Sequence, residues 1–135
     1  MSHPGQVLRE AFLWHPTSRR TIVVAVDHGL FMGPIPGTRD LHALLPQLVG
    51  GGADAIQLTP GQAEHNAAAF SGRQAPALVV RLDATNIWRK GELKPQPGYW
   101  APVATPRRAL QLGGHVAVCF LLYLFSFPPA SARKP

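Results

Sequence analysis

The chain has 135 residues, a length typical of one compact domain. Hydrophobic residues make up 46% and charged residues 15%, which favours a folded core and excludes wholesale disorder. The formal charge is +6, but the arginines are scattered and form no basic stripe with interleaved aromatics. This pattern argues against nucleic-acid binding and is compatible with a phosphorylated substrate.

The longest apolar run covers residues 116–125, and a membrane-spanning helix needs about 20 residues. Charged residues interrupt any apolar stretch near the N-terminus, so the sequence predicts no secretory signal. The single cysteine, Cys119, lies among apolar residues, as buried thiols in reducing compartments do. We therefore expect a cytoplasmic protein without a membrane partner. A weaker alternative uses residues 116–127 as a membrane-contacting tail.

The first strand is expected at residues 21–26, which are β-branched and apolar throughout, after a helical or irregular lead-in over residues 1–20. A loop rich in glycine and proline follows at residues 27–38. Asp40 is a plausible N-cap for a helix over residues 41–49, in which Pro46 should introduce a kink or delay the start.

Three glycines at positions 50–52 should end that helix. Residues 54–59 then predict a second strand and residues 62–70 a second helix. A third strand is expected at residues 77–82. The proline-rich stretch 84–105 is interpreted as an extended loop.

Thr105 can cap a short helix with Pro106 in its first position, running to Leu112. Residues 115–125 predict a fourth strand. Residues 126–135 contain proline and small polar residues where a further helix would be expected. We interpret this tail as the mark of a truncation or shifted reading frame, with a natural disordered tail as the alternative.

Strands that alternate with helices imply parallel pairing through crossover connections. Four such units could form a small open sheet or half of an eight-unit barrel, which takes about 250 residues. The predicted fold class is α/β: a partial (β/α)8 barrel over residues 1–125, followed by an irregular tail over residues 126–135.

The most informative segment is the string VAVDHG at residues 24–29, which places Asp27 and His28 where a buried strand ends. In parallel barrels this end of a strand faces the active site. The structural alternative is that Asp27 caps a turn and His28 is an ordinary loop histidine.

This string, with the nearby Gly33-Pro34, the later Gly37-x-x-Asp40 and the GGADAI strand start at residues 51–56, resembles the archaeal-type class I fructose-bisphosphate aldolases. That group is similar to the sugar-phosphate aldolases and aminodideoxyheptulosonate synthases. The resemblance is best over residues 21–61, looser over 77–86 and 113–125, and stops at Ser126.

The resemblance implies a (β/α)8 barrel in which a lysine on the sixth strand forms an iminium with the substrate ketone. It implies no cofactor and no metal. Asp27 matches the family aspartate that lines the site and is the expected catalytic residue. With His28 it is also expected to contact the sugar-phosphate substrate, and a tyrosine on a later strand transfers protons in the family.

The sequence contains three lysines: Lys90, Lys94 and Lys134. None lies at the end of a predicted buried strand, where a Schiff-base lysine could be desolvated. The family's phosphate-binding loops would also lie beyond residue 135, and Tyr99 and Tyr123 do not match its proton-transferring tyrosine. We therefore expect the isolated chain to be inactive.

Other candidates have weaker support. Asp83 ends the third strand and could assist the site or cap a turn, and Thr59 ends the second strand. The six histidines show no ligand spacing, which disfavours a zinc-dependent aldolase. A second hypothesis for the whole chain is a non-catalytic half barrel that pairs with another chain, because exposed strand edges favour self-association.

Overall fold

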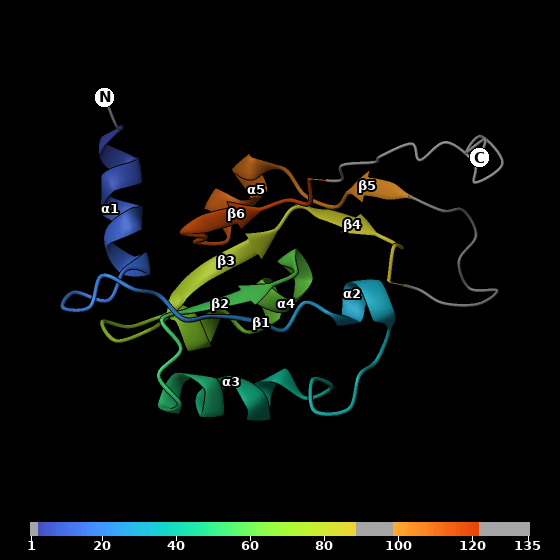
Figure 1. The fold of residues 1–135 in the computed structure, drawn as a ribbon, viewed down its shortest axis with the longest axis horizontal. Helices are drawn as coiled ribbons and strands as arrows, with labels where there is room; N and C mark the ends of the chain where they lie inside the picture. The colour runs from blue at the N-terminus through green and yellow to red at the C-terminus, as the bar shows by residue number, and fades with distance from the viewer. Residues whose placement is uncertain (1–2, 89–98, 122–135) are drawn as a thin grey trace, which may run out of the picture.

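The computed structural model describes residues 3–88 and 99–121, and its centre is a four-stranded parallel sheet (Figure 1). The strands lie in the order β1-β2-β3-β6, and each neighbouring pair is parallel. Their bounds are β1 Val23–Ala25, β2 Ala55–Leu58, β3 Ala77–Arg81 and β6 Val116–Val118. The predicted half barrel with parallel strands is therefore confirmed.

Three helices along the chain, α3 (Leu41–Gly50), α4 (Pro60–His65) and α5 (Pro106–Gln111), contribute Leu45, Ala63 and Ala109 to the main core. These side chains pack against one face of the sheet. Since successive side chains of a strand point to opposite faces, that face carries every second strand residue. The sheet residues of this core are Val24, Val26, Ile56, Leu58, Leu78, Val80 and Leu82.

The opposite face of the sheet corresponds to the interior of a barrel. A second, smaller cluster forms there from Ala55, Ala77 and Val79, with Leu13 at the end of α1 (Pro4–Leu13) packed against it. In Figure 1 α1 stands beside the amino ends of the strands, whereas α2 (Gly29–Met32) lies at their carboxyl ends. The two ends of the sheet are thus covered by different elements.

Local capping signals place the helix starts. Asp40 Oδ1 accepts from Ala43 N at 3.0 Å, so α3 begins at Leu41 and includes Pro46. Of the two expected effects of Pro46, the delayed start is wrong, and the kink stays a prediction. Thr59 forms a reciprocal capping box with Gln62 at the start of α4. Thr105 caps α5, with Pro106 in its first position, as predicted.

Three local predictions require correction. The loop expected after the first strand contains the helical turn α2, closed by Gly33 at a φ of 79°. The single helix expected over residues 62–70 is α4 followed by the 3-10 helix η1 (Ala67–Phe70). The loop expected over residues 84–105 contains an antiparallel pair, β4 (Asp83–Thr85) and β5 (Trp100–Pro102).

All four parallel strands are shorter than predicted. The last one, β6, ends at Val118, although Leu82 N still donates to Val118 O at 3.0 Å beyond the end of β3. The remaining residues of the predicted strand, 122–125, and the predicted irregular tail, 126–135, lie outside the described residues. Within the described part of the chain, no helix has the length and apolar character to cross a membrane.

Candidate active site

The alternation of side chains along three strands brings polar groups together at one point of the interior face. Ala25, Gln57 and Val79 are aligned across β1, β2 and β3. Asp27 and Arg81 lie two residues beyond Ala25 and Val79 and therefore point to the same face, nearer the carboxyl end. This is the end at which parallel barrels place their active sites.

Asp27 is 2% exposed and is bound by two side chains, one from β2 and one from β3. Gln57 Nε2 and Arg81 Nε each donate to Asp27 Oδ2 at 2.8 Å. The structure places Asp27 just beyond the carboxyl end of β1 and gives it specific partners. A turn-capping role does not account for these contacts, which span 30 and 54 residues of chain. The expectation that this strand is buried on both faces is wrong, because β1 lies at the edge of the described sheet and is only partly buried.

Asp83 belongs to the same cluster. Its Oδ2 accepts from Trp100 Nε1 and from Phe120 N, both at 2.7 Å, and Arg81 Nη1 lies 3.4 Å from its Oδ1. The pairing of β4 with β5 brings Trp100 to this position. Asp83 thus ties the β4–β5 pair and the end of β6 to the sheet, which is more than the turn cap that its position in the sequence suggested.

Aromatic rings cover the guanidinium of Arg81. Its Cζ lies 4.0 Å from the ring centroid of Phe120 and 5.4 Å from that of Phe31. Trp88 contacts both rings, with centroid distances of 5.5 Å to Phe31 and 5.0 Å to Phe120. Arg81 is 5% exposed, so its charge is neutralised by ion pairs in an environment with little water.

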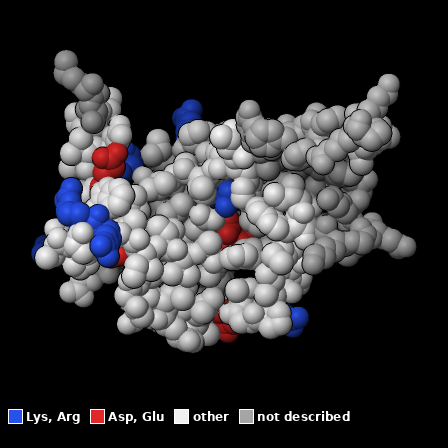
Figure 2. All heavy atoms as spheres, viewed as in Figure 1, with Lys and Arg blue, Asp and Glu red and all other residues white. Residues whose placement is uncertain are grey.

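The buried cluster contains two carboxylates, Asp27 and Asp83, and one guanidinium, Arg81. Its formal charge is therefore −1. On the face drawn in Figure 2, charged side chains gather mainly around α1 and the loop after it, with a basic and an acidic group near the middle of the molecule. A buried excess of negative charge favours a cationic group placed beside it.

His28 lies next to Asp27 in sequence but not in this cluster. It is exposed, and its backbone carbonyl accepts from Phe31 N and Met32 N at the start of α2. Among the described residues, no side chain bonds to its imidazole ring. The predicted substrate contact of His28 remains a prediction, and its position at the carboxyl end of the strands is compatible with one.

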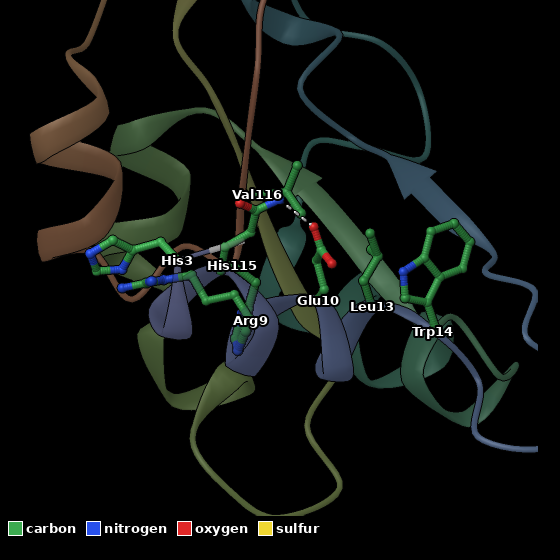
Figure 3. Close-up of a pocket in the computed structure, with 8 residues that line it drawn as sticks. His3, Arg9, Glu10, Leu13, Trp14, His115 and Val116 are labelled. Carbon is green, nitrogen blue, oxygen red and sulfur yellow. Dashed lines mark hydrogen bonds between the residues drawn. The ribbon is translucent and has the colours of Figure 1, made fainter. Parts of the chain in front are cut away.

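Two cavities of about 650 Å³ each flank the sheet. One lies at the carboxyl end, lined by Gly29, Pro34, Ile35, Thr38, Arg39 and Gln62. The other lies at the amino end, where Arg9 and Glu10 of α1 face His115 and Val116 (Figure 3) and Trp14 also lines the cavity. Only the first adjoins the segment that carries Asp27 and His28.

The other residues considered in the sequence either have structural roles or lie outside the described residues. Thr59 caps α4 and is engaged there. Tyr99 is 54% exposed and pairs through its backbone N with Asn86 Oδ1 at 3.0 Å. The three lysines and Tyr123 lie outside the described residues. Within residues 3–88 and 99–121, no three His, Cys, Asp or Glu side chains gather as metal ligands would.

Sequence reasoning missed Gln57 and Arg81. Arg81 was counted only among scattered arginines, although it interrupts the apolar strand ALVVRL. A charge inside a strand that is buried on both faces requires a partner. Gln57 similarly interrupts DAIQLT, so both polar residues carried a signal that pointed to the interior face.

Comparison with known proteins shows the family and the fold of the chain. Residues 21–127 match the DeoC/LacD family of aldolases. The chain is 35% identical over 103 residues to an uncharacterised aldolase of Saccharolobus solfataricus, a match that covers 76% of this chain and 38% of that protein.

Two solved structures share the fold: an archaeal fructose 1,6-bisphosphate aldolase and a Schiff-base-forming fructose-1,6-bisphosphate aldolase. Their TM-scores are 0.62 and 0.61, each at 20% identity. Each match covers 83% of this chain and 42% of the other chain. The chain thus spans about two fifths of the length of these relatives.

Proposed function

Because the chain belongs to the DeoC/LacD family of aldolases, we propose that it forms part of a Schiff-base aldolase that cleaves fructose bisphosphate or a related sugar phosphate. Asp27 is the proposed catalytic residue, and Asp27 with His28 would contact the substrate. The observation that carries the proposal is the buried cluster of Asp27, Arg81 and Asp83 at the carboxyl end of parallel strands.

The charge of this cluster supports chemistry through a protonated imine. In such a reaction a neutral lysine amine condenses with the substrate ketone, takes up a proton and releases water, leaving a cationic C=N bond. When the adjacent carbon–carbon bond breaks, its electron pair forms the enamine and the imine nitrogen becomes neutral. The hydroxyl on the departing carbon loses its proton and becomes the aldehyde carbonyl. A buried formal charge of −1 beside this site would favour the cationic intermediate.

The cavity at the carboxyl end supports a phosphorylated substrate. Arg39 and Thr38 line it together with Gly29, which follows His28 directly. A guanidinium beside open backbone is a group that binds phosphate oxygens, whereas the Thr38 hydroxyl already donates to Ile35 O at 3.2 Å. We therefore propose that the end of the substrate nearest His28 carries a phosphate group.

The described residues contain no lysine. We propose that the Schiff-base lysine is supplied by polypeptide other than residues 1–135, so that this chain by itself is inactive. The share of the relatives' length that the chain spans supports this proposal.

Reductive trapping tests the function. The full polypeptide encoded by the gene and the 135-residue chain are each incubated with fructose 1,6-bisphosphate and borohydride, and adducts are located by mass spectrometry. We expect a lysine adduct in an active preparation and none within residues 1–135. An adduct on Lys90, Lys94 or Lys134 would overturn the assignment of the lysine, and no adduct in either preparation would overturn the aldolase proposal.

The alternative proposal is a non-catalytic half barrel that pairs with another chain. The strand order supports it, because β1 and β6 each have one neighbour in the described sheet. Trapping without an adduct, together with a stable dimer, would favour this alternative.

A further inference from the structure

The two oxygens of the Asp27 carboxylate have different surroundings. Both of its side-chain donors, Gln57 Nε2 and Arg81 Nε, bond to Oδ2 at 2.8 Å. No side chain or backbone group of the described residues donates to Oδ1. Within the described part of the chain, the carboxylate is therefore held through Oδ2.

The side chain of Asp27 is 3% exposed. Because the two printed side-chain donors both bond to Oδ2, Oδ1 is the oxygen with capacity left to accept a hydrogen bond from a substrate hydroxyl.

Arg81 is itself fixed from several sides. Its Nε bonds to Asp27, its Nη1 lies 3.4 Å from Asp83 Oδ1, and Phe120 packs on its guanidinium at 4.0 Å. Asp83 is anchored in turn by Trp100 Nε1 and Phe120 N. A rigid chain of contacts thus runs from the β4–β5 pair through Arg81 to Asp27.

We infer that Gln57 and Arg81 are the positioning residues of the active site: they hold Asp27 through Oδ2 and present Oδ1 as the oxygen that accepts a hydrogen bond from the reacting substrate hydroxyl. The inference rests on the proposed aldolase function and adds two residues, Gln57 and Arg81, that were not among the candidates predicted from the sequence. Their role is orientation, since small displacements of a reacting group slow catalysis strongly.

The test separates imine formation from carbon–carbon cleavage. In Gln57→Met, the side chain keeps its length but cannot donate to Oδ2. We expect cleavage of fructose 1,6-bisphosphate by the full polypeptide to slow about 10- to 100-fold, while the amount of borohydride-trapped imine stays near that of the wild type. Gln47→Met is the matched control, because Gln47 is exposed on α3 and donates to Ala43 O.

Arg81→Lys is the second variant, since it keeps the charge but replaces the planar, two-point donor with a single ammonium. We expect Arg81→Lys also to slow cleavage while the amount of trapped imine stays near that of the wild type. If the two residues had a merely structural role, the rate of cleavage and the amount of trapped imine would fall in proportion, and that result would overturn the inference. An unchanged rate of cleavage in Gln57→Met would also overturn it.

Failure of the proposed function is recognised separately, as a wild-type protein that traps no imine. In that case crystal structures of the two variants decide the inference. We expect the Asp27 carboxylate to turn or shift when either donor is lost. An unchanged carboxylate in both variants would overturn the positioning role.

Discussion

Arg81 Nε donates to Asp27 Oδ2 at 2.8 Å across 54 residues of chain, and both side chains are nearly inaccessible to water. This buried ion pair joins β3 to the end of β1. These two strands are not neighbours in the sheet, because β2 lies between them. The ion pair therefore couples the stability of the sheet to the geometry of the candidate site.

Removing the cation should destabilise the fold strongly. Arg81→Met leaves two buried carboxylates without their counter-charge, a change that typically costs about 3–5 kcal/mol. Arg108→Met is the control, because its pair with Glu64 is exposed and such pairs contribute about 1 kcal/mol or less. Urea unfolding monitored by circular dichroism measures both, and equal losses for the two variants would contradict the prediction.

Gly114 should not tolerate a side chain. A Cβ at this buried position would lie 2.8 Å from Ala109 O and 2.9 Å from Val80 Cγ2, so α5 and β3 would have to separate. We expect Gly114→Ala to lower the free energy of unfolding by about 1–3 kcal/mol.

Gly61→Ala is the opposite case, since a Cβ there meets nothing within 4 Å and the residue lies in α4. It should be neutral or stabilise the fold by about 0.4–1 kcal/mol. Thermal unfolding of the two variants compares them directly, and a Gly114→Ala protein as stable as Gly61→Ala would contradict the close packing of Gly114 against Ala109 and Val80.

His115 should make stability depend on pH. Burial, and then the positive charge of Arg9, lower its pKa below the ordinary value of 6.5, and its Nδ1 accepts from Leu78 N at 3.1 Å. The unfolded chain therefore binds this proton more readily than the folded one. The stability that the fold gains from holding His115 neutral is fully present above pH 6.5, and it is lost as the pH falls from there through the folded-state pKa.

The groups that face His115 are those of the α1 region, including His3, Arg9 and Glu10 (Figure 3). In His115→Asn, unfolding free energies measured between about pH 7.5 and about pH 5.5 should decline less than in the wild type. His42→Asn, at an exposed position on α3, should keep the wild-type slope. A wild-type slope in His115→Asn would contradict the prediction.

The isolated 135-residue chain should self-associate. In the described sheet β1 and β6 form its two edges, and Val23, Trp100 and Leu121 are exposed by 45%, 49% and 92%. Unpaired strand edges beside apolar side chains favour association or precipitation. Multi-angle light scattering over a range of concentrations measures this, and a monodisperse monomer with a cooperative melt would contradict it.

The sequence by itself determined the elements whose signals are local. The mostly apolar segments at residues 23–25, 55–58 and 77–81 form strands, and Asp40, Thr59 and Thr105 cap helices, because these effects depend on neighbours within a few residues. Alternation of strands and helices then predicted a parallel sheet, and the end of the first strand predicted the place of Asp27.

Only the tertiary structure decided which groups meet there. The partners of Asp27 are Gln57 and Arg81, and those of Asp83 are Trp100 and Phe120, each from a different segment of the chain. Such contacts depend on strand order and register. They also depend on the β4–β5 pair, which was not predicted because the proline-rich sequence favoured a loop. A local pattern specifies which face a side chain occupies; the sheet as a whole specifies what lies opposite it.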